Sequence, residues 1–166
     1  MPTDWAAVYQ SLYGDLVRFL HRKVWDADRA QDLAQETFVR ALDHDPENPR
    51  AWLFTVAANL ARDEARGAVR RRAHLELVAA DPPPPPADPA AETEARERAA
   101  IARAALERLS ERDREALLLW DAGFSYDEIA AQTGLARTAV GTTLSRARHR
   151  LVEAHQALGG QHAALG

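Results

Sequence analysis

Apolar residues recur every three or four positions along the first half of the chain, the period of an amphipathic helix. The first such segment follows the N-cap Asp4, and its apolar side comprises Trp5, Val8, Leu12, Leu16, Phe19 and Leu20. A second begins at Asp26 or Asp28 and runs to Leu42, burying Ala30, Leu33, Ala34, Ala41 and Leu42. A third follows Asn48 and Pro49, persists to about Arg72, and carries Trp52, Leu53, Val56, Leu60 and Ala61.

The same period continues in the second half of the chain. Residues Glu92 to Leu109 predict a helix with Ile101, Ala105 and Leu109 on one face. Ser110 then caps a helix from Glu111 to Asp121 that carries Ala116, Leu117, Leu119 and Trp120 and stops at Gly123. No segment has the alternation of a strand, so the pattern predicts an all-α protein.

A proline-rich run separates the two halves. Asp81 to Pro89 cannot be helix interior or central strand, because proline lacks the backbone N–H donor. The sequence predicts two small helical domains, at residues 1–78 and 92–158, joined by a linker over 79–91 and followed by a fraying tail over 159–166. A linker in polyproline II conformation holds the domains on the order of 35–40 Å apart; a loop of no functional consequence is the alternative.

A helix-turn-helix pattern lies in the second domain. Ser125 to Glu128 reads as a capping box that opens a short helix, and Thr133-Gly134-Leu135 reads as the turn. In the helix that follows, Val140, Leu144, Ala147 and Leu151 form the buried stripe. The outward set suits a DNA groove and comprises Arg137, Thr138, Gly141, Thr142, Ser145, Arg148 and His149. Ala136 offers no capping oxygen at the start of this helix.

Charge and composition narrow the classes of function. The net charge of −4 is unusual for a DNA-binding protein, so binding must depend on local arginine clusters, at Arg66 and Arg70 to Arg72 and again at Arg146, Arg148 and Arg150. Cysteine is absent, and no apolar run approaches the roughly 20 residues of a membrane span. An intracellular, cytoplasmic protein is expected, without catalytic residues, metal or cofactor.

Two sets of segments, one in each predicted domain, together resemble the bacterial RNA polymerase sigma factors of the extracytoplasmic-function type. In the first domain they are Asp26 to Leu42, Pro49 to Leu53 and Asn59 to Arg66. In the second they are Leu109 to Glu115, Phe124 to Ala130, Thr138 to Val140 and Leu144 to Arg148. The resemblance implies a promoter-specificity subunit that joins RNA polymerase core and directs initiation, and not an enzyme.

The resemblance also implies three sets of site residues. The residues implied to dock on a coiled coil of the largest polymerase subunit are Asp32, Leu33, Gln35, Glu36, Phe38 and Val39. We expect Phe38 and Val39 to be an exposed apolar pair, whereas without the resemblance a core position for Phe38 is an equal alternative. The residues implied to bind the minus-ten element and to help separate its strands are Asn59, Arg62, Asp63, Arg66, Arg70 and Arg71. The residues implied to contact the minus-thirty-five element are Arg137, Thr138, Gly141, Thr142, Ser145, Arg146 and Arg148.

The sequence also departs from the family pattern and leaves alternatives open. Many relatives carry a lysine and an arginine where this chain has Gly141, Thr142 and Thr143, so fewer charge-assisted contacts are available and the base preference is not predictable. An anti-sigma partner is common in the family. The alternatives are a stand-alone helix-turn-helix regulator and a helical adaptor protein, and gel-shift with and without polymerase separates them.

Overall fold

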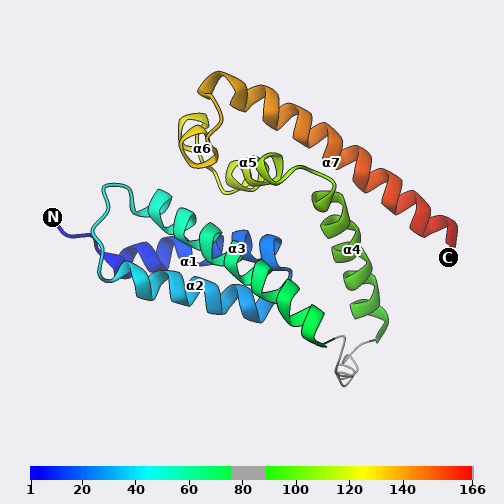
Figure 1. Cartoon of the computed structure of the whole chain (residues 1–166), viewed down its shortest axis with the longest axis horizontal. Helices are drawn as coiled ribbons and strands as arrows, with labels where there is room; N and C mark the ends of the chain where they lie inside the picture. The colour runs from blue at the N-terminus through cyan, green and yellow to red at the C-terminus, as the bar shows by residue number, and fades with distance from the viewer. Residues whose placement is uncertain (76–88, 166) are drawn as a thin grey trace. The chain divides into compact units, whose positions relative to one another are not determined.

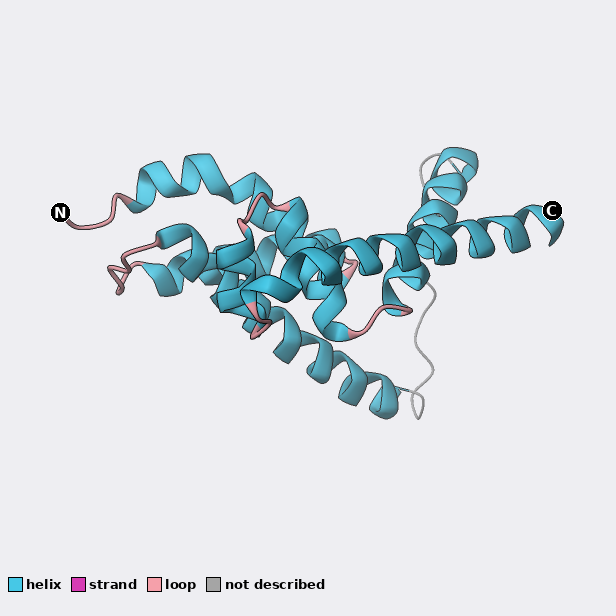
Figure 2. Ribbon diagram, turned by 90° about the horizontal axis from the view of Figure 1, so that it is seen from above, coloured by secondary structure: helices cyan, strands magenta, loops and turns pink. Residues whose placement is uncertain are grey.

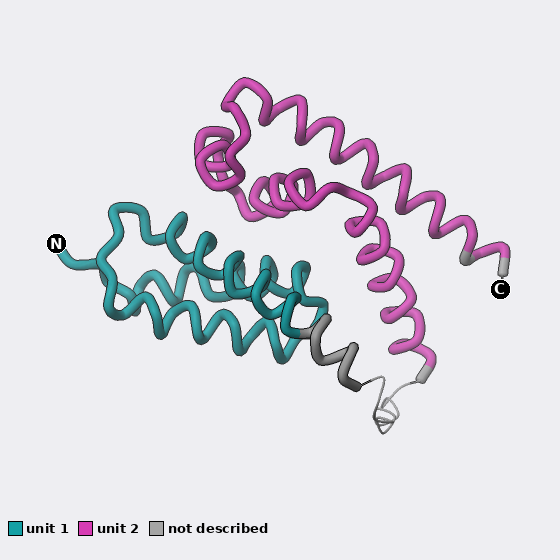
Figure 3. The backbone as a smooth tube through the Cα atoms, viewed as in Figure 1, with its two compact units in different colours: residues 1–81 teal, residues 82–166 magenta. Residues whose placement is uncertain are grey.

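The protein is built from α-helices, as the computed structural model shows (Figures 1 and 2). The structure describes residues 1–75 and 89–165, with side chains except at 68–75, 89, 162 and 165. It divides into two compact units, Met1–Asp81 and Pro82–Gly166 (Figure 3). No strand occurs in the two described ranges, and the predicted all-α class is confirmed. No helix in those ranges is long and apolar enough to cross a membrane.

The first unit is a bundle of three helices that all contact one another. They are α1 (Trp5–Val24), α2 (Ala27–Ala41) and α3 (Pro49–Leu75). The predicted N-caps are confirmed, since the side chains of Asp4, Asp26 and Asn48 each accept a hydrogen bond from a backbone N–H three residues on. The third helix extends three residues past the predicted end at Arg72.

The core of this bundle contains large side chains from α1 and α3. Leu16, Leu20, Leu53 and Phe54 are fully buried, and the Phe19 and Phe54 rings pack edge to face with centroids 5.0 Å apart. The prediction that Leu42 is buried is wrong. Its side chain is 66% exposed, and Leu42 is the C-cap residue, at which the helix that was predicted to bury it ends.

The second unit has four helices, α4 (Pro89–Glu107), α5 (Glu111–Asp121), α6 (Tyr126–Thr133) and α7 (Arg137–Leu165). The last helix contacts the other three, and α5 also contacts α6. Ser110 caps α5 as predicted, and Gly123 takes the left-handed conformation expected after its end, with φ of 90°. Leu119, Phe124, Ile129, Val140 and Leu144 form the centre of the core.

Two predicted ends in this unit differ from the structure. The helix predicted from Glu92 begins at Pro89, since proline fits the first helical position, where no N–H is needed. The tail over 159–166, predicted to fray, is helical in the structure as far as Leu165, where α7 ends. Ala154 is buried and Leu158 half-buried on this part of α7, so packing within the unit extends the helix past Gly159 and Gly160.

Candidate nucleic-acid and polymerase interfaces

The turn that leads into α7 is tightly specified by its own residues. The Glu128 N–H donates to Ser125 Oγ at 3.2 Å, and the Ser125 N–H donates to Glu128 Oε2 at 2.8 Å, which confirms the predicted capping box. At the other end of α6, Gly134 has φ of 76° and donates its N–H to the carbonyl of Ala130. A residue with a side chain is strained in that conformation, so the glycine sets the angle between α6 and α7.

One exposed face of α7 presents short polar side chains and an arginine. Val140, Leu144 and Ala147 are fully buried on the opposite side of the helix. The exposed residues, which we call the reading face, are Thr138, Thr142, Ser145 and Arg146. Their spacing of three and four residues places them along one side of the helix. Hydroxyl groups there can exchange hydrogen bonds with base edges, and the arginine can bind a guanine edge or a phosphate.

The other predicted contacts on α7 lie beside the reading face. We call this side the flank; it comprises Arg137, Gly141 and Arg148. The prediction that Gly141 points outward is wrong, because a Cβ there would lie 3.4 Å from the Tyr126 ring of α6. Arg148 is exposed, and its guanidinium lies 5.8 Å from the centroid of the Trp120 ring.

Arg137 is held by the first turn of α6. Its Nε–H donates to Asp127 Oδ1 at 2.6 Å, and its guanidinium lies 5.2 Å from the Tyr126 ring centroid. Both Arg137 and Asp127 are more than half exposed, so water screens their attraction. This contact was not predicted from the sequence, because its two partners belong to different helices and no local pattern joins them.

A polar face on α3 carries the residues predicted for the minus-ten element. Asn59, Arg62, Asp63 and Arg66 are all exposed, while Leu60 and Ala61 between them are buried. Arg62 donates to Asn59 Oδ1 at 3.4 Å, so the amide and the guanidinium lie side by side. Arg70 and Arg71 belong to α3, and their side chains lie outside the described residues. The described part of this face presents hydrogen-bonding groups next to positive charge, as single-stranded bases and phosphates require.

The residues predicted for polymerase docking divide between the surface and the core. Asp32, Gln35, Glu36 and Val39 are exposed, and we call them the outer face of α2. The expected exposed pair of Phe38 and Val39 is wrong for Phe38, which is 7% exposed. Leu33 is also buried.

Two tyrosines of α1 explain why Phe38 is covered. The Tyr9 ring packs edge to face on Phe38 at 4.9 Å, and the Tyr13 ring lies 6.4 Å from it. Gln35 donates from Nε2 to the hydroxyl oxygens of both tyrosines, at 3.2 and 3.4 Å. The exposed apolar surface at the end of α2 is formed instead by Val39 and Leu42. Sequence periodicity did not identify Leu42 as part of it.

An arginine joins the outer face of α2 to α3. Arg29 donates from Nε and Nη2 to the two carboxylate oxygens of Glu64, both at 2.9 Å, and from Nη1 to Asp32 Oδ2 at 3.1 Å. The hydrogen bonds to Glu64 raise the pKa of Arg29 above its ordinary value. A bidentate pair of this kind fixes both the distance and the orientation of the two helices.

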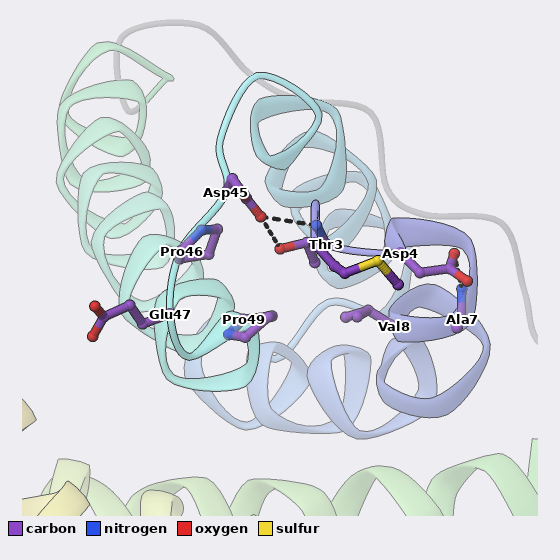
Figure 4. Close-up of a pocket in the computed structure, with 9 residues that line it drawn as sticks. Thr3, Asp4, Ala7, Val8, Asp45, Pro46, Glu47 and Pro49 are labelled. Atoms are coloured by element: carbon purple, nitrogen blue, oxygen red, sulfur yellow. Dashed lines mark hydrogen bonds between the residues drawn. The ribbon is translucent and has the colours of Figure 1, made fainter.

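The N-terminal segment holds the loop between α2 and α3. The N–H and the hydroxyl of Thr3 both donate to Asp45 Oδ1, at 2.8 and 2.6 Å (Figure 4). The Trp5 Nε1–H donates to the carbonyl of His44 at 3.0 Å, and the His44 ring lies 4.9 Å from that of Trp52. Both bonds from Thr3 lower the pKa of Asp45, and the bond from the Thr3 hydroxyl has the larger effect. Sequence analysis missed these contacts, because about 40 residues separate the partners along the chain.

A metal-binding or catalytic arrangement is not apparent in the described part of the chain. No three histidine, aspartate or glutamate side chains there lie close enough together to hold a metal ion. The exposed faces offer hydrogen bonds and positive charge, which serve recognition.

Comparisons with known proteins agree with this arrangement. The family described as "Sigma-70 region 2" matches residues 8–71, and "Sigma-70, region 4" matches residues 99–151. The chain is 38% identical to the ECF RNA polymerase sigma factor EcfG of Rhodopseudomonas palustris over 76% of this chain and 71% of that protein. It is 30% identical to the ferric citrate uptake sigma factor FecI of Escherichia coli, over 87% and 89%.

Two solved structures have a similar fold. One is the sigma factor RpoE in complex with the anti-sigma factor NepR from Bartonella quintana, with a TM-score of 0.66 and 27% identity over 92% of this chain and 97% of that one. The other is CnrH in complex with the cytosolic domain of CnrY, with a TM-score of 0.65 and 27% identity over 92% and 88%. With both conserved sigma regions present, this chain belongs to the extracytoplasmic-function sigma factors, which are promoter-specificity subunits and transcription initiation factors.

Proposed function

We propose that this sigma factor binds RNA polymerase core through the outer face of α2 and reads promoter DNA through α3 and α7. The observation that carries the proposal is the reading face of α7, four exposed polar residues that follow a capped helix and a glycine turn. An α-helix with this composition fits the major groove, where hydroxyl and guanidinium groups distinguish base pairs. The cytoplasm, where polymerase acts, is its proposed location.

The reading face contacts the minus-thirty-five element in this proposal. Thr138, Thr142 and Ser145 lie nearest the base edges, and Arg146 binds a base edge or a phosphate. Arg148 on the flank is exposed and suits a phosphate. Each base contact contributes about 1–3 kcal/mol of discrimination, and each phosphate contact contributes affinity that falls with salt.

The polar face of α3 engages the minus-ten element. Asn59 and Asp63 provide hydrogen bonds to unpaired bases, and Arg62 and Arg66 provide charge for the backbone. Arg70 and Arg71, predicted for the same role, continue the basic sequence toward the end of α3.

The outer face of α2 docks on the polymerase. Asp32 and Glu36 suit a partner surface that bears arginines, and Val39 with the neighbouring Leu42 adds exposed apolar area. In the free chain Asp32 and Glu36 are each paired with an arginine of α2 itself. On docking to the largest-subunit coiled coil, these two carboxylates therefore exchange an arginine of α2 for an arginine of the polymerase. Leu33 and Phe38 support this face from within the core.

An anti-sigma factor is a further proposed partner. Of the two structures of similar fold, one shows the sigma factor RpoE in complex with the anti-sigma factor NepR, and the other shows CnrH in complex with the cytosolic domain of CnrY. A partner that covers the outer face of α2 blocks the polymerase, which would keep this chain inactive until a signal releases it. Co-purification from the native host tests for it.

The proposed function is tested by reconstituted transcription. The purified chain is added to sigma-free core polymerase on pooled genomic DNA, and transcript starts are mapped. We expect starts that share two upstream elements. A chain that binds DNA selectively without core, and gives no specific starts with it, would instead be a stand-alone regulator, the alternative that the comparisons do not favour.

Matched variants then test two of the three surfaces, the reading face of α7 and the outer face of α2. Thr142→Ala is expected to lower initiation roughly 5- to 100-fold at promoters with the native minus-thirty-five element and to relax the base preference at the position it contacts. Its control is Thr93→Ala on exposed α4, which is expected to leave initiation unchanged. Glu36→Lys is expected to weaken core binding. Asp15→Lys, which disrupts a similar exposed ion pair on α1, is its control. Equal effects of a variant and its control would contradict the assignment.

A further inference from the structure

The start of α7 contains two features that oppose helix formation. Ala136 has no side-chain oxygen to accept a hydrogen bond from the first free N–H groups. Arg137, the first helical residue, places a positive charge at the end of the helix that is already positive. The helix nevertheless begins there, with the Ala139 N–H bonded to the carbonyl of Ala136 at 2.9 Å. Something outside the local sequence must stabilise this turn.

The first turn of α6 provides that support at two points. Asp127 binds the Arg137 guanidinium at 2.6 Å, which moves negative charge to the positive end of α7. Tyr126 lies under the same guanidinium, and its ring also touches the position of Gly141 one turn farther along α7. Two adjacent residues of α6 therefore hold two successive turns of α7.

The contact continues along the flank to α5. The Trp120 and Tyr126 rings lie 5.6 Å apart, and the Arg148 guanidinium lies over Trp120 at 5.8 Å. Two stacked contacts between cation and ring, joined by the contact of the two rings, thus run from Arg137 through Tyr126 and Trp120 to Arg148. This row lies beside the reading face and not on it, since Thr138 and Thr142 are exposed on a different side of α7.

We propose that Asp127 and Arg137 form a brace that positions the recognition helix, so that Arg137 acts on promoter DNA through Asp127 and not by contacting a base. The inference rests on the proposed role of α7 in reading the minus-thirty-five element. The brace and charge alone predict opposite effects of an Asp127 substitution on DNA binding. Removing the exposed carboxylate of Asp127 should strengthen DNA binding if charge alone matters. Under the brace it weakens binding.

The first test needs no DNA. Amide hydrogen exchange is measured on the full chain for wild type, Asp127→Ala, Arg137→Ala and the charge swap D127R/R137D, with Glu94→Ala on α4 as the control for lost charge. The brace predicts faster exchange over 140–145 in both single variants, on the order of fivefold, and recovery in the swap. Unchanged exchange in Asp127→Ala overturns the proposal. Thermal unfolding confirms that each variant is folded.

The second test measures promoter binding by the reconstituted holoenzyme on the promoter fragment recovered by start mapping. Asp127→Ala and Arg137→Ala are each expected to weaken binding about fivefold, the double variant no further, and the swap to restore it. Binding by Asp127→Ala at or above the wild-type level overturns the brace, as does a swap that stays at the level of the single variants. If wild type does not bind the fragment, the proposed function fails, and hydrogen exchange alone decides the brace.

Discussion

The carboxylate of Asp45 holds the α2–α3 loop to the N-terminal segment through both donors of Thr3. These bonds favour the charged form and lower its pKa, so the folded state binds this proton less readily than the unfolded state. The contact therefore contributes its full stability above pH 3.8, the ordinary pKa of this carboxyl group, and this contribution is lost as the pH falls below that value.

This sign leads to a pH-dependent prediction. Asp45→Ala is expected to unfold more readily than wild type at neutral pH, and the difference is expected to vanish as the pH falls below 3.8. Thermal unfolding across pH measures it. Asp43→Ala, two residues away on the same exposed loop, is the control and should show no such convergence. A difference that is independent of pH would mean that the carboxylate does not carry the contact.

Gly141 leads to a prediction about size. The Tyr126 ring leaves room for a methyl group and little more. Gly141→Ala is expected to stabilise the second unit by up to about 1 kcal/mol, because alanine favours the helix, whereas Gly141→Leu must displace the ring and costs about 1–3 kcal/mol. Chemical denaturation measures both. At Gly14 of α1, where nothing lies within 4 Å, alanine and leucine should both be tolerated.

Between elements, Arg29 and Glu64 form a bidentate pair that links α2 to α3. Glu64→Gln is expected to lower the free energy of unfolding of the first unit by about 0.5–1 kcal/mol, an amount limited by the partial exposure of Arg29. The effect should shrink in 1 M salt. Urea unfolding measures it.

The control for Glu64→Gln is Glu107→Gln. It breaks an exposed pair with Arg103 inside α4, four residues apart, and is expected to cost about 0.3–0.5 kcal/mol. If the two substitutions cost the same, the link between α2 and α3 adds nothing beyond an ordinary surface pair.

The starts of the helices were predictable from the sequence, whereas several faces and ends were not. Each of four helices begins at a capping side chain that accepts a hydrogen bond from the backbone N–H three residues on, so a few consecutive residues suffice to predict the start. The caps are Asp4, Asp26, Ser110 and Ser125. The local pattern left Phe38 open between the surface and the core, because its burial depends on Tyr9 and Tyr13 of another helix.

The same distinction applies to the candidate site. The reading face of α7 was predictable from helical periodicity together with the turn at Gly134. The inward role of Gly141 was not, because it depends on a ring fifteen residues earlier in the chain. The continuation of α7 past Gly159 and Gly160 was likewise missed, since two glycines lower helix propensity and tertiary packing overrides it.

At the scale of the whole molecule, each unit has its own buried core. Leu20 is fully buried in the first and Leu119 in the second. We expect Leu20→Ala to destabilise the first unit by about 2–5 kcal/mol and to leave hydrogen exchange in the second unchanged, with the converse for Leu119→Ala. Hydrogen exchange resolved by unit provides the measurement. Loss of protection in both units from either substitution would mean that they unfold together.

The exposure of Thr138, Thr142 and Ser145 has a consequence for how such a protein diversifies. None of these side chains is buried in the core, so substitutions there leave the fold nearly untouched. Under the role proposed for α7, duplicated copies of the gene can therefore acquire new promoter preferences by substitutions at a few exposed residues, without a compensating change elsewhere. The same freedom is open to an engineer: a library randomised at these three positions should consist mostly of folded proteins, from which regulators that do not interfere with one another can be selected.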